Sequence, residues 1–255
     1  MPELVVAGNW KMNTTVAEAV ALAAGVRDGA AAAPGVDNVE LVLCPPFVSL
    51  AAVSDAVKGS AIKVGAQNMH FQESGAFTGE VSPGMLRGLC DYVILGHSER
   101  RQLFGETDES VNSKVKAAQA AGLKPILCVG ESLEQREQGK ASDVISGQVR
   151  AGLEGVDDAS NLLVAYEPIW AIGTGQAATP ETAAEIMGGA IFETLRGLFS
   201  AAADNVPLLY GGSMNPSNAG EYAAQDCIHG GLVGGASLQA DQFLQVAAAV
   251  AAAKV

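Results

Sequence analysis

The sequence predicts an α/β fold, namely a closed parallel (β/α)8 barrel that forms a single domain over residues 1–255. The first observation is a set of eight apolar runs, each rich in Val, Ile or Leu and without polar alternation, as is typical of strands buried on both faces. The runs span residues 4–7, 39–43, 62–66, 92–95, 125–129, 162–166, 206–210 and 231–233. The second observation is that helix signals separate the runs, which predicts a parallel sheet with right-handed crossovers.

Eight β-α units in a chain of 255 residues favour closure of the sheet into a barrel. A doubly wound open sheet stays possible, because periodicity alone does not show whether a sheet closes. No linker or shift in composition marks a second domain, and hydrophobic residues make up 49% of the chain, which is enough for a substantial core.

Helix signals lie between the runs. Thr15 and Glu18 form a capping box that opens an Ala-rich helix, which runs to about residue 33, where a Pro-Gly pair stops it. Thr107 opens another helix that runs through Ala121. A final helix is expected at about residues 238–253. Three more helices are predicted by an N-cap residue followed directly by proline, in Ser82-Pro83, Thr179-Pro180 and Asn215-Pro216.

The composition limits the kind of protein this can be. The N-terminus has no basic region followed by an apolar segment, so no signal peptide is expected, and no run approaches the roughly 20 apolar residues of a membrane span. Four cysteines without C-x-x-C spacing are expected to be reduced thiols, which predicts a cytoplasmic protein. They are Cys44, Cys90, Cys128 and Cys227. The three histidines show no metal-ligand spacing, so no metal site is expected.

A formal net charge of −13 argues against nucleic acid and anionic membranes as partners. It also constrains the substrate. If the substrate is an anion, the global field repels it, so capture must rely on a local lysine and on backbone N–H groups. Screening over about 8 Å at physiological salt makes such local capture workable.

Polar residues cluster directly after the runs, and in a barrel the chemistry lies at the carboxyl ends of the strands. A purely structural barrel would not gather ionisable groups there, because buried charges are costly unless they are paired. In order along the chain, the residues are Asn9 and Lys11, Gln67 and Asn68, His97 and Glu99, Gly130 and Glu131, Glu167, Gly211-Gly212-Ser213, and Gly234-Gly235.

Each residue also has a purely structural interpretation. Taken alone, Lys11 could be a surface lysine, and His97 could be a core histidine with satisfied hydrogen bonds. Arg100 and Arg101 are best read as members of ion pairs at the rim. The two glycine pairs could be tight turns, although bare backbone after the last two strands is also what a phosphate site requires. The joint placement of these residues, rather than any one of them, points to a functional site.

The stretch 166–175 joins a carboxylate to an unusual loop. Glu167 stands where the sixth run stops, and Pro168 ends the strand because it cannot donate to a ladder. The following residues are apolar and end in a Gly-Thr-Gly sequence. An apolar loop of this kind fits a lid that closes over a pocket, and a buried crossover is the alternative.

The chemistry that these residues allow is narrow, since they offer one carboxylate (Glu167), one imidazole (His97), one ammonium (Lys11) and a phosphate cradle. A carboxylate can take a proton from a carbon beside a carbonyl, while a neutral imidazole and an ammonium stabilise the enediolate. Return of the proton to the neighbouring carbon completes an aldose–ketose isomerisation.

In these residues the sequence closely resembles the triosephosphate isomerase family, whose fold is the TIM barrel. The matching stretches cover the whole chain in family order. They are Ala7-Gly8-Asn9-Trp10-Lys11-Met12-Asn13, Gly65-Ala66-Gln67-Asn68, Gly96-His97-Ser98-Glu99-Arg100-Arg101, Cys128-Val129-Gly130-Glu131, Tyr166-Glu167-Pro168-Ile169-Trp170-Ala171-Ile172-Gly173-Thr174-Gly175, Tyr210-Gly211-Gly212-Ser213 and Leu232-Val233-Gly234-Gly235-Ala236.

The resemblance implies a role for five catalytic residues in the interconversion of dihydroxyacetone phosphate and D-glyceraldehyde 3-phosphate, a step of glycolysis and gluconeogenesis. Glu167 would be the base, and neutral His97, at a helix start, would be the electrophile. Lys11 would bind the anionic substrate, with Asn9 positioning it. Glu99 would orient Lys11, or alternatively take part in a proton relay. These roles rest on the resemblance.

The resemblance further implies that Gly173, Ser213, Gly234 and Gly235 bind the phosphate through backbone N–H groups, and that residues 168–178 form the lid. Closure would exclude water and suppress elimination of phosphate from the enediolate. No cofactor and no metal are implied.

The resemblance also implies a homodimer. The loop 69–79 would insert into the partner subunit, with Thr78 near the partner's active site, and Glu80 and Arg101 would form a supporting ion pair. The loop's apolar residues fit a buried interface better than a free loop. They are Met69, Phe71, Ala76 and Phe77.

Two positions depart from the family pattern. The far hinge of the lid carries Gln176-Ala177 where the family often has Lys-Thr, and His229 stands where the family usually has an acidic residue. Two other functions stay open on the residues alone. One is a different phosphate-binding barrel enzyme, such as an aldolase that uses Lys11 as a Schiff base, and the other is a non-enzymatic barrel kept for binding or scaffolding.

Overall fold

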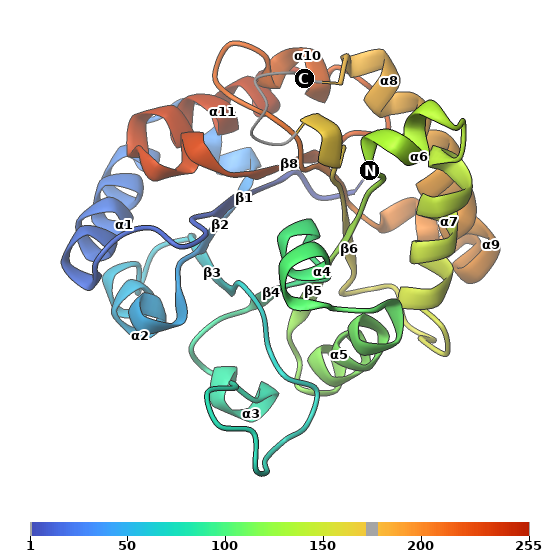
Figure 1. Ribbon diagram of the computed structural model, residues 1–255. Coiled ribbons are helices and arrows are strands. Elements are labelled where there is room, and N and C mark those ends of the chain that lie inside the picture. Colours follow the sequence, from blue (N-terminus) through green and yellow to red (C-terminus); the bar gives the residue numbers. More distant parts are fainter. Residues whose placement is uncertain (1, 172–177, 255) are drawn as a thin grey trace.

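A computed structural model describes residues 2–171 and 178–254 of the chain. Eight parallel strands close into a barrel in sequence order, which confirms the predicted closed barrel and excludes the open sheet. Figure 1 shows the strands at the centre, with the helices arranged around them. The strands are β1 (Val5–Asn9), β2 (Glu40–Cys44), β3 (Lys63–Ala66), β4 (Tyr92–Leu95), β5 (Lys124–Val129), β6 (Leu163–Tyr166), β7 (Leu208–Tyr210) and β8 (Gly230–Val233).

All eight predicted runs coincide with strands, and the differences lie at the ends. β1 extends two residues further than expected, so that Asn9 is its last residue. β7 begins at Leu208 rather than at Val206. The N–H of Val206 is taken by the carbonyl of Ala203, and Pro207 has no N–H to donate to a ladder.

The helices outnumber the predicted ones, because several connections contain two of them. The helices are α1 (Val16–Ala30), α2 (Phe47–Ala56), α3 (Pro83–Leu86), α4 (Ser98–Phe104), α5 (Asp108–Ala120), α6 (Leu133–Glu137), α7 (Ala141–Gly152), α8 (Pro180–Glu185), α9 (Glu193–Phe199), α10 (Ala219–Ala223) and α11 (Ala240–Ala252). A π-helical segment, Ile186–Phe192, joins α8 to α9. No described helix is long and apolar enough to cross a membrane.

The capping signals were correct at most helix starts. Thr15 and Glu18 form the predicted capping box of α1, although the helix ends at Ala30 and not at residue 33. The expected helix start at Asn215-Pro216 is wrong. The side chain of Asn215 accepts the N–H of Ser217 at 2.9 Å, as an N-cap side chain would, but residues 216–218 form a turn and α10 begins only at Ala219.

The core has two layers. Alternate strand residues fill the barrel interior, and the others pack outward against the helices, which explains why the strands read as unbroken apolar runs. The interior residues are Val5, Ala7, Val42, Cys44, Tyr92, Ile94, Ile126, Cys128, Leu163, Ala165, Leu209 and Leu232. Because the interior is filled, the barrel has no central pore, and in folds of this kind the active site lies at the carboxyl ends of the strands.

Candidate active site

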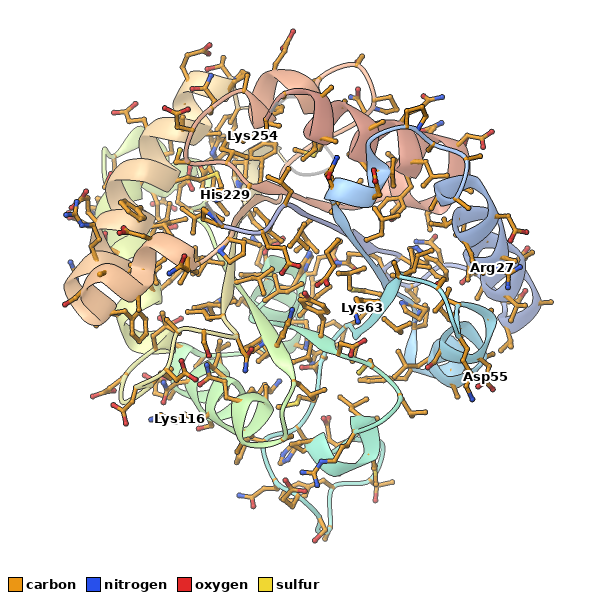
Figure 2. All side chains as sticks on the ribbon, turned by 180° about the vertical axis from the view of Figure 1, so that it is seen from behind. Arg27, Asp55, Lys63, Lys116, His229 and Lys254 are labelled. Atoms are coloured by element: carbon orange, nitrogen blue, oxygen red, sulfur yellow. The ribbon has the colours of Figure 1, made fainter. Side chains whose placement is uncertain are left out.

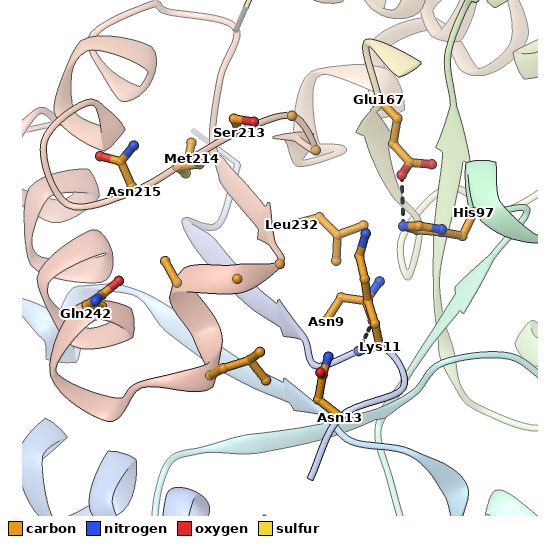
Figure 3. Close-up of a pocket in the computed structure, with 16 residues that line it drawn as sticks. Asn9, Lys11, Asn13, His97, Glu167, Ser213, Met214, Asn215, Leu232 and Gln242 are labelled. Carbon is orange, nitrogen blue, oxygen red and sulfur yellow. Dashed lines mark hydrogen bonds and ion pairs between the residues drawn. The ribbon is translucent and has the colours of Figure 1, made fainter. Parts of the chain in front are cut away.

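A cavity of about 420 Å³ opens at the carboxyl ends of the strands. Figure 3 shows Glu167 and His97 on one side of it and Lys11 and Asn9 beside them. The lining residues are Asn9, Lys11, Asn13, His97, Glu167, Gly211, Gly212, Ser213, Met214, Asn215, Leu232, Gly234, Gly235, Ala236, Leu238 and Gln242. The structure therefore brings together three ionisable groups from the ends of different strands, as the sequence predicted.

Glu167 directly follows β6 and is only 1% exposed. Its carboxylate accepts the N–H of Ser98 at 2.8 Å and the hydroxyl of Ser98 at 3.1 Å, and it lies 2.9 Å from Nε2 of His97. Burial raises the pKa of Glu167, but the charge and hydrogen bonds of His97 and the hydrogen bonds of Ser98 outweigh it, and the net shift is downward. Glu167 is therefore an ionised carboxylate, as a base must be.

His97 is the N-cap of α4, and its Nδ1 accepts the N–H of Glu99 at 3.2 Å. That bond places the ring proton on Nε2, which donates to Glu167. Burial lowers the pKa of His97, whereas the carboxylates of Glu167 and Glu99 raise it above its ordinary value. If Glu167 moves away toward a substrate, the strongest of these raising effects is lost, and the helix start then favours a neutral ring with Nε2–H facing the cavity.

Lys11 is held in an unusual backbone conformation, with φ of 52°. A left-handed non-glycine residue is strained by about 1–3 kcal/mol unless its surroundings support it. Here the side chain of Gln67 donates to the carbonyl of Lys11 at 2.9 Å, and the N–H of Lys11 donates to Oδ1 of Asn9 at 3.0 Å. The ammonium forms an ion pair with Glu99 at 2.5 Å. Asn9, Gln67 and Glu99 together aim the lysine at the cavity.

The two glycine pairs serve different purposes. A Cβ atom on Gly212 would lie 2.3 Å from the hydroxyl of Tyr210, and one on Gly211 would lie 3.0 Å from Cγ of Glu167, so close packing excludes side chains there. A Cβ atom on Gly235 would meet nothing within 4 Å, and one on Gly234 would meet only Lys11 at 3.7 Å. The backbone of Gly234 and Gly235 is therefore open to the cavity, as a phosphate site requires.

The loop after Glu167 is anchored where it is described. The indole of Trp170 donates to the buried carboxylate of Glu131 at 2.8 Å, and the hydroxyl of Tyr166 donates to the same oxygen at 3.1 Å. The guanidinium of Arg136 lies over the Trp170 ring, 4.6 Å from its centroid. Gly173 and the hinge Gln176-Ala177 lie outside the described residues.

The remaining predicted residues are placed as follows. Ser213 lines the cavity, and its hydroxyl donates to the carbonyl of Ala171 at 3.2 Å. Glu99 lies behind Lys11 and does not line the cavity. His229 is at the amino end of β8, at the opposite end of the barrel.

Sequence reasoning gave no role to Ser98 or Gln67. Ser98 follows His97 at the start of α4, where a free backbone N–H is expected, and that signal could have suggested a carboxylate partner. Gln67 was recognised only as a polar residue after the third run. Nothing in the sequence shows that its side chain also reaches the carbonyl of Cys44, at 2.9 Å.

Comparisons with known proteins agree on one family. The sequence profile of the triosephosphate isomerase family matches residues 4–250. The chain is 52% identical to a triosephosphate isomerase of Clostridium perfringens over 248 residues, which are 95% of this chain and 97% of the relative. It is 48% identical to a triosephosphate isomerase of Dehalococcoides mccartyi over 246 residues, 96% of each chain. It is 49% identical to that of Endomicrobium trichonymphae over 249 residues, 96% of this chain and 98% of the relative.

Proposed function

The chain belongs to the triosephosphate isomerase family, and from this premise we propose how its cavity performs that reaction. The enzyme interconverts dihydroxyacetone phosphate and D-glyceraldehyde 3-phosphate, an isomerisation in glycolysis and gluconeogenesis. One observation carries the assignment of roles. The carboxylate of Glu167, Nε2–H of His97 and the ammonium of Lys11 face one cavity whose far wall is the bare backbone of Gly234 and Gly235.

The substrate's phosphate is expected at the backbone of Gly234 and Gly235, beside Ser213, with Gly173 completing the cradle from the lid. Backbone N–H groups without a Cβ atom in the way can approach phosphate oxygens closely. The open space around Gly235 supports this placement. The ammonium of Lys11 supplies the local positive charge that a chain with net charge −13 needs to hold an anion.

Glu167 takes the proton from C1 and returns it to C2. In the described arrangement its two oxygens are held by Ser98 and His97, so the carboxylate must leave at least one of these bonds to reach a substrate carbon. Its lowered pKa keeps it ionised at neutral pH, and transfer into a closed cavity without water strengthens it as a base.

Negative charge that develops on the two substrate oxygens is stabilised by hydrogen-bond donors and an ammonium group in the same cavity. Neutral His97 donates its Nε2–H to the enediolate, and the Lys11 ammonium and the Asn9 amide lie beside it in the same cavity. Glu99 acts through Lys11, because it pairs with the ammonium but does not line the cavity. Preorganised donors of this kind are worth about 10²–10³ in rate each.

Residues 168–178 form the lid in this proposal. Both flanks have firm anchors, since Trp170 is bonded to Glu131, and the carbonyl of Ala178 accepts the hydroxyl of Tyr222. Closure keeps water from the enediolate and prevents loss of phosphate.

The homodimer is likewise a proposal. The loop 69–79 and α3 project from the barrel in Figure 1, and large apolar side chains are exposed on them, namely Phe71, Phe77 and Met85. Further exposed apolar side chains lie at the starts of other connections and on α4. These are Met12, Phe47, Val48, Leu103 and Phe104. Insertion of the loop into a second copy would cover this surface and bring Thr78 near the partner's cavity.

The four cysteines are free thiols, which supports a cytoplasmic location.

Within one chain, Arg101 pairs with Asp108 and donates to the carbonyls of Gly96 and Cys128. The expected Glu80–Arg101 ion pair is not formed inside the described part of the subunit, so it would have to form across the interface. Sedimentation velocity tests the dimer, with Phe77→Asp expected to give monomers. A monomeric wild-type protein at micromolar concentration would contradict the proposal.

A coupled assay of the purified protein with glyceraldehyde 3-phosphate tests the assigned roles, using Glu167→Asp as the informative variant. A shorter side chain retreats from the substrate carbon, so turnover is expected to fall by about 10²-fold while binding is kept. Unchanged turnover would show that Glu167 is not the base. Borohydride trapping separates the aldolase alternative, because a covalent adduct on Lys11 would favour a Schiff base.

A further inference from the structure

We propose that Gln148, on α7 outside the barrel, is a positioning residue that fixes the main chain of Glu167 through the peptide of Gly130. Gln148 does not line the cavity, so it does not touch a bound substrate. The inference rests on the proposed role of Glu167 as the base. It concerns a helix that the reaction does not otherwise involve.

The side chain of Gln148 forms hydrogen bonds with both backbone polar groups of Gly130, its N–H and its carbonyl. Its Oε1 accepts the N–H of Gly130 at 2.8 Å, and its Nε2 donates to the carbonyl of Gly130 at 3.1 Å. Gly130 follows the last residue of β5, and the last register pair between β4 and β5 is Leu95 with Leu127. Gly130 therefore lies beyond the end of β4, and Gln148 supplies the two hydrogen bonds that a longer neighbouring strand would supply.

Gly130 lies directly against the backbone of Glu167. A Cβ atom on Gly130 would be 1.9 Å from the carbonyl oxygen of Glu167 and 3.2 Å from its Cβ atom. On either side of this contact, the N–H of Glu167 donates to Val129 at 2.8 Å, and the N–H of Ile169 donates to Glu131 at 3.2 Å. A shift of Gly130 is thus passed to the residue that carries the carboxylate.

Glu167 is sensitive to such a shift because its main chain sets where the carboxylate lies, both when it is bonded to Ser98 and when it turns toward a substrate. It is bonded to the N–H and hydroxyl of Ser98 at 2.8 and 3.1 Å. A misplacement of about 1 Å can lower a rate by about 10²-fold, even when the substitution lies away from the chemistry. The short contact at Gly130 and the two bonds of Gln148 make α7 the outer support of the base (Figure 1).

The chain offers a matched control in Asn112, which lies on α5 and bonds to the end of α7. The side-chain amide of Asn112 donates to the carbonyls of Gly152 and Glu154, at 3.0 and 2.9 Å, at the carboxyl end of α7. Asn112 and Gln148 are both half-buried, and each makes two hydrogen bonds to main chain. Only the bonds of Gln148 lie beside Glu167, so the two sites separate support of the fold from support of the base.

The experiment compares Gln148→Met with Asn112→Leu, each close in shape to the original residue, by steady-state kinetics over a range of pH and by thermal unfolding. Both are expected to lower the melting temperature to a similar extent. Gln148→Met alone should lower kcat about tenfold, a fraction of the loss for a full misplacement, with KM unchanged. It should also move the acid limb of kcat/KM to higher pH, because a shifted Glu167 loses part of its bonding to Ser98.

Equal kinetics of the two variants would overturn the inference, as would a loss in Gln148→Met with no movement of the acid limb. If Gln148→Met does not fold, Gln148→Glu replaces it, since it keeps the acceptor for the N–H of Gly130 and loses the donor. Glu167→Gln is measured alongside. If it retains full turnover, the proposed function fails; if it is inactive while Gln148 variants match the control, only this inference fails.

Discussion

The two ends of the barrel carry similar side chains and put them to opposite use. At the carboxyl end, Glu167, His97 and Lys11 surround a cavity of about 420 Å³. At the amino end, the hydroxyl of Tyr92 donates to Glu40, and Lys124 lies 2.9 Å from that hydroxyl and 3.5 Å from Glu40. Figure 2, seen from behind, shows the amino end, with Lys63 at the start of β3 near its middle.

The difference lies in whether the cluster faces a cavity. The amino-end cluster is satisfied internally, and the ammonium of Lys124 also lies 5.0 Å from the Tyr92 ring centroid and 3.8 Å from Glu3. The carboxyl-end cluster includes a left-handed lysine and open glycine backbone, which a stability-optimised end would not need. A charge acts as a functional group where the fold holds it toward empty space, and as a structural group where its neighbours fill that space.

The largest expected effect is at the carboxyl end. Glu167→Gln keeps an acceptor for Ser98 but removes the proposed base, so kcat should fall by about 10⁴-fold with little change in melting temperature. Glu40→Gln is the matched change at the amino end, and its kcat should stay within about twofold of wild type. A coupled assay measures both, and equal losses would mean that the two ends do not differ in function.

Lysine gives the second contrast. Lys11→Met removes the ammonium from the cavity, and kcat/KM should fall by about 10³-fold, because neither the bound anion nor the developing charge is neutralised. Lys124→Met should leave kcat/KM nearly unchanged and lower stability instead. Isothermal titration with a phosphorylated substrate analogue checks that the loss in Lys11→Met is one of binding; unaltered affinity would refute that part of the assignment.

His229, at the amino end of the barrel, is expected to make the stability of the protein depend on pH. His229 accepts the N–H of Leu208 at 3.1 Å through Nδ1, and burial, with Lys254 adding to it, lowers its pKa to about 4. In the unfolded chain this imidazole gains a proton near pH 6.5, whereas in the folded protein it does so only near pH 4. The stability that the neutral ring contributes is therefore fully present above pH 6.5 and is lost as the pH falls toward 4, by about 3 kcal/mol.

Denaturant unfolding of wild type and His229→Gln between pH 7 and pH 4 measures this contribution. The glutamine can still accept from Leu208 but does not titrate, so its stability should fall less steeply. Parallel pH curves for the two proteins would show that His229 is not responsible.

The smallest expected effect is Tyr92→Phe. It removes one hydroxyl that joins Glu40 to Lys124 and leaves Glu40 with fewer partners, so the free energy of unfolding should fall by about 1–2 kcal/mol. Activity should be unchanged because the cluster lies at the far end of the barrel. Chemical denaturation and a coupled assay on the same sample test both parts, and a drop in kcat without a drop in stability would be inconsistent with a structural role.

The strands and the grouping of site residues could be predicted because both follow from local pattern. Continuous apolar runs mark strands buried on both faces, and polar residues directly after them mark one end of the barrel. The bonds that tune the site could not be predicted. Ser98 and Glu167 are 69 residues apart, and Gln67 meets Lys11 across 56 residues. Such pairs form only once the sheet has closed.

Backbone conformation was the other limit. The left-handed φ of Lys11 contradicts the preference of lysine, and it is explained only by the side chains of Asn9 and Gln67 that hold it. Asn215 shows the opposite case, in which a local signal predicted a helix start that the structure places further along the chain. Its local signal fits a helix start, but the same side chain can close an Asx turn, and the structure contains the turn.

Solvent exchange during turnover tests most directly whether Glu167 moves a proton between two carbons. Dihydroxyacetone phosphate is converted in deuterium oxide with a chelator present, and NMR spectroscopy locates deuterium in the product. The wild-type enzyme is expected to place solvent-derived deuterium on the carbon beside the carbonyl, and Glu167→Gln to place none above the uncatalysed background. Rapid isomerisation by Glu167→Gln, or incorporation of deuterium by that variant at the wild-type level, would contradict proton transfer through this carboxylate.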